Sequence, residues 1–227
     1  MQLYIGNKNY SSWSMRPWVL MRQAGIAFDE VKLRFDAFSP DSRFKREIAR
    51  VTPAGRVPVL VDAGFAVWDT LAIAEYLAEK FSDKALWPAD AEARARARSI
   101  CCEMHSGFGA LRGHFPMNIG ASLPAVGERV LREQPAVRED LDRITSMWRA
   151  SLDAHGGPLL FGQFSITDAM FAPVVTRLMT YRVSVDQDIA LYMQRVAALP
   201  GVAAWVADAL AERDFLAFEE PYRQAAD

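Results

Sequence analysis

Hydrophobic and polar residues follow strand spacing and helical spacing in turn over the first third of the chain, and helical spacing predominates after it. Val57, Val59 and Val61 lie two residues apart, which is the spacing of a short β-strand. The turn-forming residues at 62–64 separate this strand from a second apolar run at 65–68. The two runs predict a β-hairpin. After the hairpin the apolar positions change to helical spacing, at Leu71, Ala74, Leu77, Ala78 and Phe81.

The residues before the hairpin predict two further strands and two helices. We expect strands at 2–6 and 28–35, a helix at 15–24 and a short charged helix at 40–50. With the hairpin and its following helix, the element order is β-α-β-α-β-β-α. A β-α-β crossover is right-handed in nearly all proteins, which leaves few topologies. The order is thioredoxin-like and predicts an α/β domain over residues 1–81.

After a linker at 82–90 the chain is expected to be almost entirely helical. Helical spacing or composition covers 91–111, 136–155, 189–199 and 202–213, whereas Gly, Pro and Asn interrupt 113–124. A further helix after Ser165 is apolar on nearly every side and should be buried. Ser165 and Asp168 resemble a capping box, which is a structural role. The second predicted domain, at 91–227, is therefore all-α, with a loose tail at its end.

Composition narrows the possible partners. The 227 residues are 51% hydrophobic and 24% charged, and the net charge of -2 argues against a nucleic-acid surface built on bulk positive charge. No run of about 18 apolar residues predicts a membrane span, and the N-terminus lacks a secretory core. Cys101 and Cys102 are adjacent, which is not a metal or redox spacing. We expect a cytoplasmic protein with reduced cysteines and no metal, nucleic acid or membrane partner.

Candidate binding groups stand on both sides of the hairpin. Asp69 and Thr70 open a helix, where such residues most often serve only as caps. The N–H groups of a helix start and the Thr70 hydroxyl also suit a carboxylate, and the Asp69 carboxylate suits an ammonium. Pro58 has no N–H for a strand ladder, and by frequency alone its peptide bond would be trans.

The whole chain resembles the glutathione S-transferases, which combine a thioredoxin-like domain with an all-helical domain. The resemblance rests on Val57-Pro58, on Asp69-Thr70 downstream, and on the cap at 165–168. In that family the proline is cis, the residue before it offers its backbone to the cysteinyl part of glutathione, and an acid–hydroxyl pair binds the γ-glutamyl group. Lys45 and Arg56 lie where the family contacts the glycine carboxylate, although Lys and Arg are usually solvated surface charges. The implied glutathione contacts are therefore Lys45, Arg56, Val57, Pro58, Asp69 and Thr70.

The resemblance also implies a hydrogen-bond donor for the glutathione sulfur, because a free thiol has a pKa of about 8.5 and reacts as the thiolate. In the family this donor lies between the first strand and the first helix, where this chain reads Tyr-Ser-Ser-Trp-Ser-Met-Arg at 10–16. The segment is similar to the Ser-Ser-Cys-Ser-x-Arg of zeta-like serine transferases, which include maleylacetoacetate isomerases. Alignment on Arg16 assigns the catalytic role to Ser11, with Ser12 as a second donor. Trp13 stands where the zeta pattern has cysteine.

Two tyrosines are rival donors, because other branches of the family use tyrosine. Tyr4 lies within the first strand, where core packing is favoured, and Tyr10 is one residue early. Ser11 and Ser12 also have a plain interpretation as loop or cap residues. No cysteine occupies the segment, so disulfide chemistry of the omega or glutaredoxin type lacks its nucleophile.

The second substrate is expected against the helix predicted around residues 104–115. Phe108, Leu111 and Phe115 are candidates for an apolar pocket, and Arg112 is a candidate for holding an anionic electrophile. Met and Phe at helical spacing are more often core residues, so both interpretations stay open.

The resemblance implies a homodimeric, detoxifying transferase that joins glutathione to small electrophiles. An alternative is a glutathione-dependent cis–trans isomerase of a maleylacetoacetate-type substrate, which the serine segment favours and Trp13 disfavours. A third hypothesis is a transferase-like binding or stress-response protein without chemistry.

Overall fold

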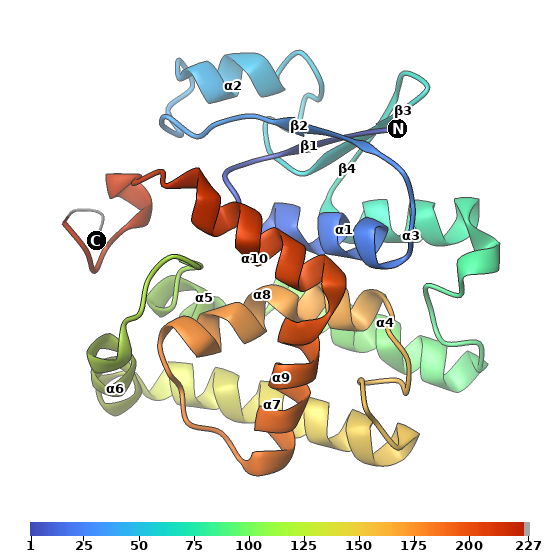
Figure 1. The fold of residues 1–227 in the computed structure, drawn as a ribbon, viewed down its shortest axis with the longest axis vertical. Coiled ribbons are helices and arrows are strands. Elements are labelled where there is room, and N and C mark those ends of the chain that lie inside the picture. Colours follow the sequence, from blue (N-terminus) through green and yellow to red (C-terminus); the bar gives the residue numbers. More distant parts are fainter. Residues whose placement is uncertain (225–227) are drawn as a thin grey trace.

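The computed structural model describes residues 1–224 and places a small sheet beside a larger group of helices (Figure 1). The strands are β1 (Gln2–Ile5), β2 (Asp29–Lys32), β3 (Val59–Asp62) and β4 (Phe65–Trp68). They form one sheet in the order β2-β1-β3-β4, in which β1 is parallel to β2 and antiparallel to β3. The predicted hairpin is confirmed, because β3 and β4 pair along their full lengths.

Three helices accompany the sheet: α1 (Ser12–Gln23), α2 (Arg43–Ile48) and α3 (Thr70–Lys80). The first begins three residues before the predicted start, because Ser12 and Ser14 are buried and Ser14 Oγ accepts a hydrogen bond from the Gly6 N–H at 3.2 Å. The second strand is shorter than predicted, since β1 offers only four residues for pairing. The α/β class predicted for the first part is confirmed.

The second part of the described chain is helical, as predicted. Its elements are η1 (Ser82–Lys84), α4 (Ala91–Ser106), α5 (Gly109–His114), α6 (Pro124–Glu133), α7 (Pro135–His155), α8 (Ile166–Thr180), α9 (Gln187–Ala198), α10 (Pro200–Glu212) and η2 (Ala217–Glu219). The helix expected through residue 111 ends at Ser106, because Gly107 and Phe108 interrupt it, the latter with a φ of 55°. The sequence did not predict α6, although Pro124 stands at a helix start where proline is common.

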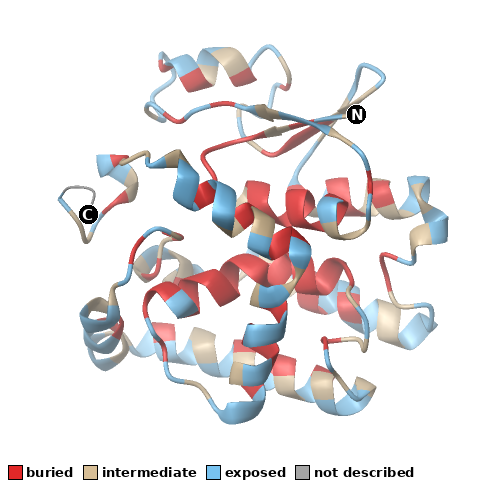
Figure 2. Ribbon diagram, viewed as in Figure 1, coloured by how far each residue is buried: buried red, intermediate tan, exposed pale blue. Residues whose placement is uncertain are grey.

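Helix α8 is the centre of the core. All of its residues except Met179 are buried, and it packs against α1, α4 and α9. Figure 2 shows the buried positions gathered where α1 and α8 face each other. The predicted cap is present: Ser165 Oγ accepts from the Thr167 N–H at 3.2 Å, and Asp168 Oδ2 accepts from the Ser165 N–H at 3.0 Å. The structural role predicted for Ser165 and Asp168 is therefore confirmed.

The division into domains at 1–81 and 91–227 stays a prediction. Helix α1 packs on α8 and α10 as well as on α3 and β1, so the two parts share one continuous apolar core. Residues 82–90 connect α3 to α4 and contain η1.

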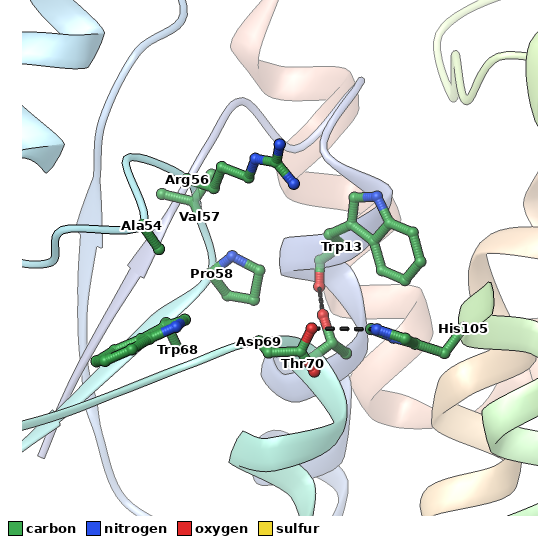
Figure 3. A pocket seen from close by; sticks show the side chains of 9 residues that line it. All are labelled: Trp13, Ala54, Arg56, Val57, Pro58, Trp68, Asp69, Thr70 and His105. Carbon is green, nitrogen blue, oxygen red and sulfur yellow. Dashed lines mark hydrogen bonds and ion pairs between the residues drawn. The ribbon is translucent and has the colours of Figure 1, made fainter.

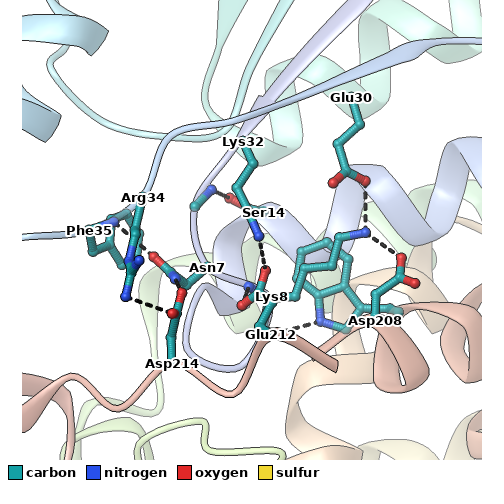
Figure 4. A network of polar contacts seen from close by, with 12 residues as sticks. Asn7, Lys8, Ser14, Glu30, Lys32, Arg34, Phe35, Asp208, Glu212 and Asp214 are labelled. Atoms are coloured by element: carbon teal, nitrogen blue, oxygen red, sulfur yellow. Dashed lines mark hydrogen bonds and ion pairs between the residues drawn. The ribbon is translucent and has the colours of Figure 1, made fainter. Parts of the chain in front are cut away.

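The C-terminal segment, residues 213–224, packs against the loop after β1, so the prediction of a loose tail is wrong for these residues. Asn7 Nδ2 donates to Asp214 Oδ2 at 2.6 Å, and the Lys8 ammonium pairs with Asp208 of α10 at 2.5 Å (Figure 4). Polar pairs between residues about 200 positions apart leave no local pattern in the sequence.

Within residues 1–224, no single helix is both long and apolar enough to cross a membrane. Helices α9 and α10 meet those criteria only as a pair, which is bent by 72° at its junction. Residues 225–227, the end of the predicted tail and of the second predicted domain, lie outside the described residues.

Candidate active site

Two adjoining cavities lie along the loops between the sheet and the helical part. The first, of about 500 Å³, is lined by four residues that were predicted to contact glutathione: Val57, Pro58, Asp69 and Thr70 (Figure 3). The second, of about 400 Å³, contains Tyr10, Ser11, Ser12, Lys45 and Arg112. Trp13, Arg56 and Val57 line both cavities. The two cavities therefore adjoin at these three residues.

The start of α3 forms one end of the first cavity. Asp69 caps the helix with a φ of 74°, and its Oδ1 accepts hydrogen bonds from the Leu71 and Ala72 N–H groups. Its Oδ2 lies 3.1 Å from His105 Nε2, at the end of α4. Thr70 Oγ1 donates to the Trp13 carbonyl oxygen at 3.3 Å. The cap and the ligand role are compatible, because the two carboxylate oxygens of Asp69 face different groups.

The segment before β3 crosses the junction of the two cavities. The Val57-Pro58 bond is cis, as the family resemblance implied and against the trans default. The ladder between β1 and β3 ends at the pair of Tyr4 and Val59. Val57 therefore lies beyond the paired residues, and it lines both cavities.

The two candidate serines are both buried, at 7% and 6% exposure, yet they make different hydrogen bonds. Ser11 precedes α1, and its Oγ donates to Ser14 Oγ at 2.8 Å. Ser12 is the first residue of α1, and its Oγ accepts from Arg177 Nη2 at 3.1 Å. Both serines line the second cavity.

The hydroxyl groups of the rival tyrosines have other hydrogen-bond partners. The Tyr10 hydroxyl donates to Glu220 Oε1 at 2.7 Å and to the Asp214 carbonyl oxygen at 2.9 Å. Burial, with the bond to Glu220, raises the pKa of Tyr10 to about 12. The Tyr4 hydroxyl lies 3.5 Å from Gln2 Oε1 at the surface and lines neither cavity. The bonds of Tyr10 anchor the C-terminal segment and oppose a role as thiol donor.

The candidate cations both reach the second cavity. Lys45, on α2, donates through Nζ to the Gly55 carbonyl oxygen at 2.8 Å. Arg56 lies between the two cavities and makes no hydrogen bond or ion pair within the described residues (Figure 3). Arg56 is therefore the freer of the two to meet a carboxylate.

The structure favours the core interpretation of the apolar residues predicted to line the second-substrate pocket. Leu111 and Phe115 are fully buried, and Phe115 stacks on Tyr181 with ring centroids 4.4 Å apart. Phe108 is 7% exposed and lines neither cavity. The helical spacing of these residues comes from the core, and of the predicted set Arg112 alone lines the second cavity.

Several site residues were missed by the sequence analysis. Arg177 of α8 and His105 of α4 lie far along the chain from the residues they contact. Phe35, Phe38 and Phe44 line the second cavity in place of the predicted helix residues. An arginine inside the otherwise apolar pattern of 166–180 was the one available signal for Arg177.

Two family models match the chain. Residues 10–80 match the glutathione S-transferase N-terminal domain, and residues 91–208 match the glutathione S-transferase C-terminal domain. Glutathione S-transferase D7 of Drosophila melanogaster is 44% identical over 55 residues, which are 23% of this chain and 25% of that protein. A probable maleylacetoacetate isomerase of Caenorhabditis elegans is 31% identical over 106 residues, 47% of each chain. These matches thus span less than half of either relative.

A solved structure has the same fold over nearly its whole length. It is a glutathione transferase homolog from Burkholderia with bound glutathione, and it superposes with a TM-score of 0.67 at 25% identity, covering 92% of this chain and 96% of that one. The likeness extends over both the sheet and the helical part, as do the two family models. The chain belongs to the glutathione S-transferase family.

Proposed function

We propose that the protein is a glutathione transferase that joins the glutathione thiolate to a small electrophile. The observation that carries this proposal is the junction of the two cavities. Asp69 and Thr70 lie in the first cavity, the buried serines lie in the second, and Val57 belongs to both. A tripeptide held at its amino-acid end can therefore present its thiol to the serines. The glutathione bound by the Burkholderia relative supports this ligand.

Each part of glutathione meets a suitable group. The γ-glutamyl ammonium pairs with the Asp69 carboxylate, and its carboxylate meets the Thr70 hydroxyl and the N-terminus of α3. The cysteinyl backbone lies along Val57, and the glycine carboxylate reaches Arg56 or Lys45. His105 contacts Asp69 Oδ2, the carboxylate oxygen that does not cap α3, so the arriving ammonium replaces that contact or adds to it.

The reaction needs no covalent bond to the protein. The thiol S–H bond breaks, its proton leaves to water, and the electron pair stays on sulfur. The sulfur then bonds to the electrophilic carbon while a leaving group departs with its electron pair, or a conjugated alkene takes up a proton at the neighbouring carbon. The protein contributes by stabilising the thiolate and by holding the two reactants close together.

A second candidate function is cis–trans isomerisation of a maleyl-type double bond, in which the thiol adds, the single bond rotates and the thiol leaves. The second cavity favours it, because Lys45, Arg56, Arg112 and Arg177 line this cavity with one acid, Glu219, among the described residues. Such a wall suits a substrate with carboxylates. The similarity to a probable maleylacetoacetate isomerase supports the same candidate.

Product analysis separates these functions. The protein is incubated with glutathione and either chloronitrobenzene-type, enone-type or maleyl-type acceptors, and products are identified by mass and by double-bond geometry. A glutathione conjugate identifies the transferase, and an unchanged mass with a trans product identifies the isomerase. Glutathione binding without either product would leave a binding protein without chemistry.

We further propose that the chain acts as a homodimer, as its family does. Light scattering that gives twice the mass of one chain is the expected result. A monomeric mass at working concentration would contradict this proposal without affecting the assignment of the cavities.

A further inference from the structure

Three arginine side chains lie close to one another beside the turn formed by Ser11 and Ser12, here called the serine turn. Arg16 comes from α1, Arg112 from α5 and Arg177 from α8. The arginine ion pairs within the described residues are made by other side chains, so none of these three charges has a carboxylate partner. Their mutual repulsion adds to burial in lowering the pKa of Arg16 and Arg177. The group is a concentration of uncompensated positive charge.

Arg177 is the member in contact with a candidate catalytic residue. It is 4% exposed, its Nε donates to the Phe115 carbonyl oxygen at 2.8 Å, and its Nη2 donates to Ser12 Oγ at 3.1 Å. Its Nη1 is buried without a hydrogen-bond partner in the described residues. Burial, followed by repulsion from Arg112, lowers the pKa of Arg177 to about 10, so it keeps its charge at neutral pH.

The other titratable groups near Arg177 offset its charge only in part. Glu219 of η2 lines the same cavity, and burial raises its pKa to about 7. Burial also raises the pKa values of Tyr10 and Tyr181, which keeps both phenols neutral. Lys45 and Arg56, from α2 and the loop before β3, add further cations to the cavity wall.

An uncompensated buried charge is costly, and it is retained most readily where an anion binds. Arg112 and Arg177 line the second cavity, and so does Ser12, which accepts a hydrogen bond from Arg177. An anion placed in that cavity beside Ser12 therefore offsets the cost. The thiolate of glutathione is such an anion, since the thiol extends to this place.

The hydrogen bonds of the two serines also distinguish them. Ser11 donates its hydroxyl proton to Ser14 Oγ, whose oxygen also accepts from the Gly6 N–H. The Ser12 oxygen instead accepts from Arg177, and its own proton has no acceptor within the described residues. A hydroxyl that accepts from a guanidinium is polarised toward giving its proton to another acceptor.

We propose that Ser12 is the hydroxyl that donates to the glutathione sulfur, and that Arg177 is the positioning residue that orients Ser12 and supplies the positive field. This assignment rests on the proposed binding of glutathione and changes the expected order of the serines. When the thiol S–H bond breaks, the proton leaves to water and the electron pair stays on sulfur, which then accepts the Ser12 O–H. No bond of the protein is broken, and Arg177 stays protonated throughout.

The test is the pKa of the bound glutathione thiol, followed by ultraviolet thiolate absorbance against pH. We compare the wild type with Ser12→Ala, Ser11→Ala, Arg177→Met and Arg177→Lys. Ser12→Ala and Arg177→Met are expected to raise that pKa by about one unit, a tenfold loss of thiolate near neutral pH. Arg177→Lys keeps the charge and should retain most of the wild-type value. Ser11→Ala should change it by much less.

Arg177→Lys and Arg177→Met both remove the guanidinium bond to the Phe115 carbonyl oxygen. If Arg177 had only a structural role, the two substitutions would therefore change the thiol pKa alike. Thermal unfolding identifies any variant that fails to fold, and Ser12→Ala, a small change at the edge of a cavity, then carries the test. If wild-type protein binds glutathione with a lowered thiol pKa, and Ser11→Ala alone raises it, this inference is overturned while the transferase proposal stands. If the wild type does not bind glutathione, the proposed function fails and the inference with it.

Discussion

Ser11 and Ser12 differ in the hydrogen-bond partners of their hydroxyl groups. Ser11 and Ser12 are equally buried neighbours, but one gives its proton to another serine and the other receives a bond from a buried arginine. The sequence could locate the serine turn, because it lies at a fixed distance from Arg16. The resemblance placed Ser11 before Ser12, whereas the order proposed above rests on Arg177, which lies 165 positions from Ser12 and left no signal beside it in the sequence.

Tyr10 provides a prediction that separates anchoring from catalysis. Tyr10→Phe removes the hydroxyl that donates to the Glu220 carboxylate and accepts from the Leu216 N–H, and both of these hydrogen bonds are buried. We expect a loss of about 1–3 kcal/mol in the free energy of unfolding, with turnover within a few-fold of wild type. Urea unfolding and initial-rate assays measure the two quantities. A hundredfold fall in turnover at unchanged stability would show that Tyr10 is the thiol donor after all.

Glu219 predicts a pH dependence within the second cavity. Burial raises the pKa of this carboxyl to about 7, so it is neutral below that pH and adds a negative charge above it. The KM for a carboxylate-bearing acceptor is therefore expected to rise as pH increases through about 7. Glu219→Gln should remove this rise, whereas Glu139→Gln, on the exposed surface of α7, should not. Parallel profiles for the wild type and Glu219→Gln would count against the placement of Glu219 at the substrate.

At the scale of elements, the sequence predicted best where local pattern and tertiary role agree. The hairpin, the cap of α8 and the start of α3 each follow from turn or capping residues that act locally. The residues at 108–115 were left open between core and pocket, because a buried helix and a pocket-lining helix have the same apolar spacing. Phe115 is buried in the core, where it stacks on Tyr181.

The cap of α8 gives an element-scale prediction. Asp168 accepts hydrogen bonds from the Leu160 and Ser165 N–H groups, and Asn at this position would turn N–H donors toward one of them. We expect Asp168→Asn to lower the free energy of unfolding by about 1–3 kcal/mol.

The same substitution has a defined pH signature. Burial raises the pKa of Asp168 from 3.8 to about 6 in the folded state, so the folded protein binds more protons between these values. The stability that this group contributes is fully present below the lower value and declines as pH rises toward 6. The difference in unfolding free energy between wild type and Asp168→Asn should therefore shrink across this interval. A difference that grows with pH would show that the ionised carboxylate is the favoured partner.

At the scale of the whole molecule, a polar network joins the sheet to the last helix. The Lys8 ammonium lies between Glu30 of β2 and Asp208 of α10, and 4% of the lysine side chain is exposed (Figure 4). The Trp205 indole N–H donates to the Lys8 carbonyl oxygen at 3.0 Å. This network joins α10 to the loop after β1, and the residues that follow α10 include Glu219, which lines the second cavity.

Removing the charge at the centre of this network should weaken the whole fold. Lys8→Met keeps the apolar stem but leaves the two carboxylates facing each other, and we expect a loss of about 1–3 kcal/mol in unfolding free energy. The control is Lys32→Met, since Lys32 is 41% exposed in its pair with Glu212 and should contribute less than about 1 kcal/mol. Urea unfolding measures both. Equal effects of the two substitutions would contradict the central role of Lys8.

The central claim is that the first cavity binds the γ-glutamyl end of glutathione through Asp69. Calorimetric titration with glutathione of the wild type, Asp69→Asn and Asp69→Ala tests it most directly. Asn keeps an oxygen for the cap of α3 but removes the negative charge, so both variants should bind at least about tenfold more weakly, as expected when a charged partner is lost. Wild-type affinity in Asp69→Asn, or no binding by the wild type at millimolar glutathione, would contradict the account.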